Sequence, residues 1–253
     1  MRFGLVLPTW IYNDERLRLA RPAFASLRLT KCPTYSPYLL VLHKGDWDAG
    51  LLGFDIGDHG HGTSKRFGEF MVFGIPEPPV VSGTEQTLAY GTEMMLEFPE
   101  VSHIVWMGDD ALFNPDWLIE LEALIERHPS AVSWSVYHSA YQGVHRDLEV
   151  RACERHGRGG PFHRPGYDVL VRSICGHGMT FTREEWTAWG VHWTQGKEWS
   201  SARGTTLDMH HACNREGERW VTKESYVEHT GRSGKHCIPE IPEYATEFVG
   251  LDQ

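Results

Sequence analysis

Short apolar runs alternate with amphipathic stretches along the first half of the chain. Four apolar runs have the length of buried strands: residues 3–7, 38–43, 67–75 and 103–107. Two stretches carry apolar residues at helical spacing: residues 14–29 and 83–98. Pro22 interrupts the first stretch, so we expect a kink or a second helix start there. Strands that alternate with helices favour an α/β fold with a mostly parallel sheet and helices on both faces.

The second half of the chain is less regular. Residues 131–137 and 169–174 are strand-like, residues 205–216 have helical character, and residues 140–167 are rich in loop-forming residues. No internal repeat or clean linker divides the sequence. We therefore expect a single domain over residues 1–253, with an elaborated C-terminal half.

Two adjacent acids, Asp109 and Asp110, follow the apolar run at residues 103–107. A helix is expected to open directly after them, at Asn114 and Pro115, which suit a cap and a first helical position. Acids at the end of a buried strand are costly to leave unpaired, and a divalent cation that also binds phosphate offsets that cost. Open α/β sheets bind their ligands at the carboxyl ends of their strands, which is where these two acids are expected. The pattern indicates chemistry on a nucleotide-linked substrate, although a polar turn would have the same residues.

Charge and cysteine content narrow the classes of function. The formal net charge of −10 argues against a broad electrostatic grip on nucleic acid or on an anionic membrane. Arginines between residues 146 and 164 give a local basic bias that leaves a nucleic-acid acceptor open. Five dispersed cysteines without a CxxC pair suit reduced thiols, and no apolar run reaches the length of a membrane span. We expect a soluble cytoplasmic protein.

Several motifs occur in the order found in a known enzyme family. They are Leu7-Pro-Thr9 followed by Asn13, Gly108-Asp-Asp110 followed by Asn114-Pro-Asp-Trp-Leu118, Gly176-His-Gly-Met-Thr-Phe-Thr-Arg-Glu184, Thr206-Leu-Asp208 and Tyr226-Val-Glu-His229. Together they resemble the GT-A glycosyltransferases, close to the inverting glycosyltransferase family 2, over about residues 3–232. Three positions depart from the family pattern. Gly108 replaces the first acid of the metal-binding triplet, Leu207 replaces the first acid of a Glu-Asp pair, and Tyr90 precedes Gly91 where Asn is common.

The resemblance implies a GT-A-like, Rossmann-related fold. In it, residues 1–118 bind the nucleotide sugar, residues 119–235 bind the acceptor, and residues 236–253 form a tail. The implied activity is metal-dependent, inverting transfer of a sugar from a nucleoside-diphosphate sugar, UDP-linked in particular. The acceptor would be a hydroxyl of a glycan, a small molecule or a modified nucleobase.

The resemblance also assigns roles to individual residues. Asp110 and His229 would bind Mn²⁺ or Mg²⁺, Asp109 would bind the ribose or a metal-bound water, and Asp208 would be the catalytic base. The remaining binding residues are Pro8 and Thr9 at the base pocket, Asp46 (or Asp48) at the uracil ring, Arg232 with Lys235 at the diphosphate, and Gly176, His177 and Gly178 at the acceptor.

Other interpretations of these residues and of the chain remain open. Asp208 or Thr205 would also serve as a helix cap, and a lone histidine such as His229 is commonly structural. His59-Gly-His-Gly62 is a poor zinc motif and is expected to be a flexible loop. A nucleotidyltransferase would need a Gly-rich basic loop after the first strand, which residues 8–12 lack. The further alternatives are a non-catalytic nucleotide- or sugar-binding module and the same transfer chemistry on a modified DNA base.

Overall fold

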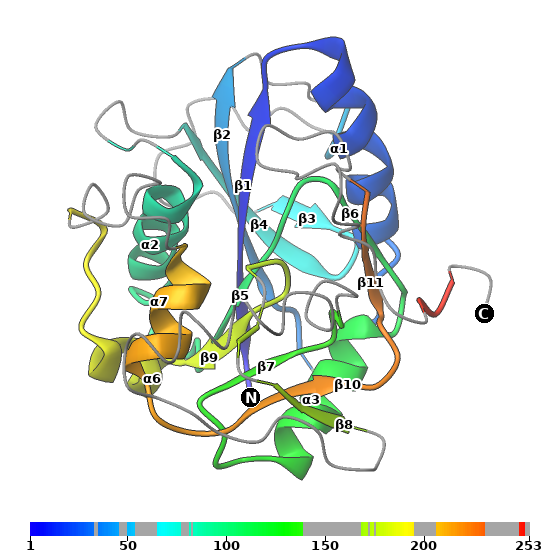
Figure 1. Ribbon diagram of the computed structural model, residues 1–253. Helices are drawn as coiled ribbons and strands as arrows, with labels where there is room; N and C mark the ends of the chain where they lie inside the picture. Colours follow the sequence, from blue (N-terminus) through cyan, green and yellow to red (C-terminus); the bar gives the residue numbers. More distant parts are fainter. Residues whose placement is uncertain are drawn as a thin grey trace, which may run out of the picture.

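The computed structural model describes residues 1–32, 35–45, 50–53, 65–76, 81, 83–138, 168–171, 173–174, 176–194, 206–230 and 248–250. Within them one sheet has nine strands, shown in Figure 1. In spatial order they are β3 (Lys65–Phe67), β4 (Phe70–Pro76), β2 (Tyr38–Gly45), β1 (Phe3–Ile11), β5 (His103–Trp106), β9 (Thr180–Thr182), β7 (Ser133–Ser135), β10 (Arg219–Thr222) and β8 (Asp168–Val171). A separate antiparallel pair is formed by β6 (Ala111–Phe113) and β11 (Val227–His229).

The direction of the strands changes along this sheet. β4, β2, β1 and β5 are parallel to one another. β9 is antiparallel to both β5 and β7, while β7 and β10 are parallel. Strands β3 and β8 are antiparallel to their neighbours at the two ends of the sheet. The sheet is thus mixed, and the first half of the chain builds its four-stranded parallel part, β4-β2-β1-β5, as the alternating pattern predicted.

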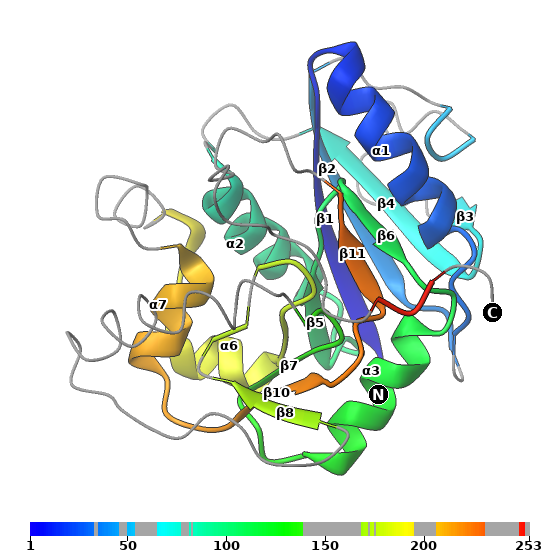
Figure 2. The same ribbon diagram turned by 45° about the vertical axis from the view of Figure 1, so that its right-hand side comes forward.

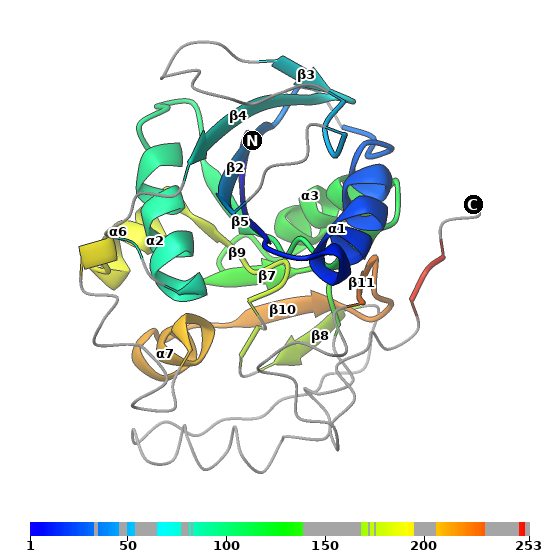
Figure 3. The same ribbon diagram turned by 90° about the horizontal axis from the view of Figure 1, so that it is seen from above.

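Helices cover both faces of the sheet, which confirms the α/β fold. Helices α1 (Asp14–Leu27) and α3 (Trp117–Arg127) lie on one face, and α2 (Thr84–Met95), α6 (Arg183–Trp189) and α7 (Leu207–Asn214) lie on the other, as Figure 3 shows. Each face has its own hydrophobic cluster. Phe24 and Leu121 belong to the first cluster, and Trp106 and Trp186 belong to the second.

Strand β1 is longer than the apolar run that predicted it. It continues through Pro8 and Thr9 to Ile11, because β2 pairs with it along its whole length. The carbonyl of Val6 accepts a hydrogen bond from Met107 N on the β5 side. Pro8 lies two residues further and faces the same side, where β5 has ended, so its missing N–H costs no sheet hydrogen bond.

The predicted strand at residues 67–75 is wrong in one respect, because the structure has a hairpin there. β3 and β4 pair with each other, and Gly68 lies in the turn with a φ of 58°. A Cβ at Gly68 would lie 2.5 Å from the carbonyl oxygen of Arg28, so only glycine fits both the left-handed backbone and the close approach.

Two predictions about helix starts are also corrected. Pro22 lies inside one continuous helix, α1, so the expected alternative of a second helix start is wrong, whereas that of a kink stays a prediction. Helix α3 begins at Trp117, and Asn114 does not cap it. Instead, Asn114 Oδ1 accepts a hydrogen bond from Asp116 N at 2.8 Å, and Nδ2 donates to the carbonyl of Gly250 at 2.8 Å. Asn114 therefore holds a C-terminal residue against the loop that leads into α3.

None of the helices in the described part of the chain has both the length and the apolar character that crossing a membrane requires.

Candidate functional site

Strand β1 continues beyond Val6, where its pairing with β5 ends. On that side its neighbour is then the acidic loop, residues 107–110, which follows β5. The backbone N of Trp10 donates a hydrogen bond to Asp109 Oδ2 at 3.2 Å. The guanidinium of Arg16 contacts both acids: one nitrogen donates to Asp109 Oδ1, and the other lies 3.3 Å from Asp110 Oδ2. Both oxygens of Asp109 therefore have protein partners, which holds the acidic loop against the end of β1.

Arg16 was not among the residues that the sequence predicted for this site. It lies in the first turn of α1, where Asn13 caps the helix by accepting a hydrogen bond from Arg16 N at 2.8 Å. A cation in a first turn opposes the helix dipole. The sequence contained one signal for this role. An arginine is unfavourable in the first turn of a helix, so its presence there indicates that acids elsewhere in the fold pair with it.

Asp110 and His229 are brought together by the small β6–β11 sheet. His229 pairs with Ala111 in the strand register, which puts it beside the residue that precedes Ala111. Thr230 fixes this arrangement, because its backbone N and its hydroxyl both donate to the carbonyl of Asp110 at 2.8 Å. His229 Nε2 lies 3.4 Å from Asp110 Oδ2. The sequence placed both residues at one metal, and the structure brings them within reach of one ion.

His177 joins this pair from a third segment of the chain. The turn that carries it is fastened to β5, since Gly178 N donates to the carbonyl of Trp106 at 2.7 Å and Trp106 N donates to that of Met179 at 2.9 Å. Gly178 has a φ of 80°, which favours glycine at that position. The ring of His177 stacks on that of His229, with ring centroids 4.3 Å apart and an angle of 28° between the planes.

The three side chains have the character of a metal site. One potential ligand atom from each of Asp110, His177 and His229 lies within 4.8 Å of the other two. Metal–ligand bonds of about 2.1 Å put donor atoms roughly 3–4 Å apart, so a small side-chain adjustment is sufficient to close the site on an ion. Asp109 and Asp110 share the positive charge of Arg16. A bound cation would balance the second negative charge. The donor set thus fits a divalent cation.

The two acids differ in their protonation behaviour. Burial raises the pKa of Asp109 to about 6, although the charge of Arg16 acts in the opposite direction. Burial acts on Asp110 as well, but its hydrogen bond with His229 and the nearby His177 and Arg16 outweigh it and hold the pKa of Asp110 well below its usual range. Asp110 is therefore the acid that remains ionised and ready to bind a cation.

Asp208 lies in the first turn of α7 and is partly buried. Thr206 is the N-cap residue, and its hydroxyl donates to Asp208 Oδ1, so the alternative of Asp208 as the cap is wrong. Figures 1 and 2 show the N-terminal end of α7 on the side to which β1 and β2 point. Leu207, which replaces an acid of the family pattern, is buried in the same hydrophobic cluster as Trp106. A carboxylate at that position would have no place in this core.

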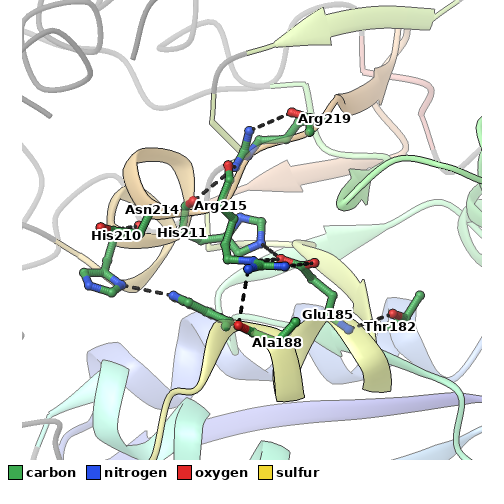
Figure 4. A network of polar contacts seen from close by, with 10 residues as sticks. Thr182, Glu185, Ala188, His210, His211, Asn214, Arg215 and Arg219 are labelled. Atoms are coloured by element: carbon green, nitrogen blue, oxygen red, sulfur yellow. Dashed lines mark hydrogen bonds and ion pairs between the residues drawn. The ribbon is translucent and has the colours of Figure 1, made fainter. Parts of the chain in front are cut away.

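A buried polar network fastens α7 to α6 and is shown in Figure 4. Glu185 accepts a hydrogen bond from His211 Nε2 at 3.0 Å and two from the guanidinium of Arg215, at 2.7 and 3.0 Å. Arg219 donates to the carbonyls of His211 and Arg215. The helix that carries Asp208 is thus fixed one turn further along by a carboxylate with two basic partners, an arrangement that the sequence did not predict.

The remaining predicted residues have no tested role. Pro8 and Thr9 lie inside β1 and are buried, and the hydroxyl oxygen of Thr9 has no hydrogen-bond partner among the described residues. Gly176 and Gly178 flank His177 in its turn. Outside the described residues lie Asp46, Asp48, Arg232, Lys235, Thr205, the segment His59–Gly62 and the arginines between residues 146 and 164. Their assignments stay predictions.

Neither a protein-family model nor a curated protein matches the chain in sequence. Solved structures do match its fold. S. aureus TarS superposes with a TM-score of 0.52 at 12% identity over 90% of this chain, and TarS 1–349 in complex with UDP-GlcNAc gives 0.52 at 13% identity over 93% of it. These proteins are glycosyltransferases of GT-A type. The chain has a GT-A-like fold.

The extent of this similarity limits what it shows. The chain spans 36% of the TarS chain and 60% of the TarS 1–349 chain. A mannosyltransferase from Pyrobaculum calidifontis in complex with GDP-Man and Mn²⁺ superposes with a TM-score of 0.46 at 14% identity, over 72% of this chain and 45% of its own. At such identities the similarity establishes the fold expected from the sequence, and the residues of this chain must carry the argument for its chemistry.

Proposed function

We propose that the protein is a metal-dependent inverting glycosyltransferase that transfers a sugar from a nucleoside-diphosphate sugar to an acceptor hydroxyl. The observation that carries the proposal is the convergence of Asp110, His177 and His229 beside the carboxyl end of β5. Open α/β sheets bind their ligands at this edge. The TarS complex with UDP-GlcNAc, on a fold similar to that of this chain, supports a UDP-linked donor.

The donor side of the reaction depends on the acidic loop. Asp110 and His229 would hold the ion, and Asp109 would keep the loop in place through Trp10 and Arg16. A divalent ion bound there supplies a Lewis acid that neutralises charge on the departing diphosphate. The ionised carboxylate of Asp110 favours a bound cation, because Asp109 and Asp110 share the charge of Arg16.

The acceptor side depends on Asp208. Its carboxylate would take the proton of the acceptor hydroxyl while the oxygen forms a bond to the anomeric carbon. The bond from that carbon to the diphosphate oxygen breaks at the same time, so the nucleoside diphosphate leaves and the anomeric centre inverts. The hydrogen bond from Thr206 and the fixed position of α7 would orient Asp208 for this step.

Binding calorimetry tests this function. We expect UDP to bind the wild-type protein in the presence of Mn²⁺ and only weakly without it, and we expect GDP and ADP to bind less tightly. The Asp110→Ala variant should lose the metal-dependent part of the binding, which we expect to be a loss of about 100-fold or more. Asp116→Ala is the matched control, because Asp116 is a partly exposed acid six residues along the chain that pairs with Lys31 and not with Arg16.

The outcome of the binding experiment decides whether the proposal stands. Metal-dependent UDP binding that survives in Asp116→Ala and is lost in Asp110→Ala supports the transferase and justifies a screen of UDP-sugars for hydrolysis and transfer. Absence of binding by all three nucleotides with Mn²⁺ and with Mg²⁺ would overturn the proposal.

A further inference from the structure

Gly108 and His177 occupy one small space at the end of β5. A Cβ built on Gly108 would lie 2.4 Å from His177 Nδ1 and 2.8 Å from Asp110 Oδ1. The backbone of Gly108 does not have a positive φ, so glycine is not required by its conformation. It is required by the volume of the imidazole ring, and any other residue at position 108 would push His177 away.

This contact relates two features that the sequence presented separately. Position 108 is where the resemblance places the first acid of the metal-binding triplet, and His177 was predicted to contact the acceptor. The structure shows that the space without a side chain at position 108 is filled by the ring of His177. An imidazole from a distant segment thus lies beside Asp110 where the family pattern has a carboxylate.

Contacts on several sides hold the ring of His177 in place. The turn is held to β5 by backbone hydrogen bonds on both sides of Trp106. One side of the ring stacks on His229, and the ring of Tyr137 meets it edge-on at a centroid distance of 6.3 Å. The ring thus lies between fixed partners and presents a nitrogen to the same point as Asp110 and His229.

We infer that His177 is a third protein ligand of the metal and that the resulting set of two imidazoles and one carboxylate selects a first-row transition ion over Mg²⁺. This inference rests on the metal dependence in the proposed function. Mg²⁺ binds oxygen ligands and water almost exclusively, whereas imidazole nitrogen suits transition ions, and a set of two histidines and a carboxylate is a recurrent site for them. Mn²⁺ is the weakest binder of that series, so a preference for it over Mg²⁺ is a demanding test.

Metal binding to the full chain, measured by calorimetry with Mn²⁺ or Mg²⁺ alone, tests the inference. The wild-type protein should bind Mn²⁺ at least about 10-fold more tightly than Mg²⁺. His177→Ala should weaken Mn²⁺ binding by about 10- to 100-fold and leave the weaker Mg²⁺ binding nearly unchanged, so that the preference collapses. His192→Ala replaces a largely exposed histidine outside the cluster and should change neither affinity.

Gly108→Ala provides a second variant that keeps all three ligands. Its methyl group would crowd the ring of His177 most closely and Asp110 Oδ1 as well, so it should lose the preference for Mn²⁺ as His177→Ala does and bind both metals more weakly. Co²⁺ gives a spectroscopic readout, because its visible absorption bands depend on the ligands and on their geometry and should change in both variants but not in His192→Ala. Thermal unfolding monitored by circular dichroism establishes that each variant is folded.

Retention of the Mn²⁺ preference in folded His177→Ala and Gly108→Ala would overturn the inference and return His177 to the acceptor side. That result would leave the proposed function intact, provided that UDP still binds with metal. Conversely, a wild-type protein that binds Mn²⁺ through His177 but binds no nucleotide would refute the transferase and retain the metal site.

Discussion

Asp109 and Glu185 are both buried carboxylates that accept hydrogen bonds from an arginine, yet their surroundings differ in charge balance. Glu185 stands alone between two basic partners, His211 and Arg215, and their hydrogen bonds outweigh the effect of burial and lower its pKa to about 2. Asp109 shares Arg16 with a second acid, and there burial prevails and raises its pKa to about 6.

The difference separates a structural network from a site that is built to receive a ligand. Around Glu185 the donors satisfy both carboxylate oxygens and the charge is balanced within the protein. Around Asp109 and Asp110, one arginine of the described residues, Arg16, pairs with two acids. Proteins retain such an unbalanced arrangement where a cation or a charged substrate completes it.

The largest expected effect comes from removing one charge from each cluster with an amide of the same shape. Glu185→Gln should lower the free energy of unfolding by about 3 kcal/mol, because it leaves Arg215 without its buried counter-charge. Asp109→Asn should change it by less than about 1 kcal/mol, because Arg16 keeps Asp110 and the unfavourable burial of a second carboxylate is relieved. Urea denaturation at pH 7 measures both values.

Equal losses in these two variants would contradict the distinction between the clusters. Asp168→Asn is a useful reference for the pair, since Asp168 is also a buried acid, held by Arg127 at 2.8 Å, but belongs to neither cluster.

An effect of similar size is expected when the pH is varied, and its sign differs between His211 and Asp109. Burial lowers the pKa of His211 from 6.5 to about 4. Its contribution to stability is therefore complete above pH 6.5 and declines as the pH falls towards 4, by about 3 kcal/mol. Asp109 acts in the opposite direction, since its pKa is raised to about 6 and its contribution is lost as the pH rises through that value.

Unfolding free energies between pH 7 and pH 4 distinguish these contributions. His211→Asn should make the decline of stability on acidification shallower than in the wild type, and Asp109→Asn should make it steeper. Parallel curves for all three proteins would show that neither group is linked to folding in this way. The largely exposed His192 supplies the control, because His192→Asn should leave the slope unchanged.

Features encoded in short stretches of sequence were predicted well. The alternation of strands and helices and the acids after β5 follow from local patterns of apolar and polar residues. The placement of His229 beside Asp110 came from the family resemblance. Short strands were missed because three or four residues, as in β6 and β10, carry too little periodicity to be recognised. The hairpin at Gly68 was missed because the close approach of Arg28 is a tertiary contact.

The composition of the site could be predicted only in part for the same reason. Asp109 and Asp110 are adjacent in the sequence, but Arg16 and His177 reach them from segments more than 60 residues away. Arg16 reaches the acids because β1 continues past the end of β5 and leads into α1. His177 reaches them because backbone hydrogen bonds hold residues 178 and 179 to Trp106. The sequence showed that Gly108 departs from the family pattern. Only the structure shows that the ring of His177 fills the space beside Gly108.

The smallest effect is expected at the cap of α1, which orients Arg16 towards the acids. Asn13→Ala removes the acceptor for Arg16 N and should lower the free energy of unfolding by about 1 kcal/mol. Asn13→Asp keeps a side-chain acceptor and should restore most of that loss. Asn214→Ala, at the last residue of α7, removes one exposed hydrogen bond to the carbonyl of His210 and should cost much less. If Asn13→Ala and Asn13→Asp were equally destabilised in urea, the cap would not be what holds Arg16, and its contact with Asp109 and Asp110 would itself be the anchor of the helix.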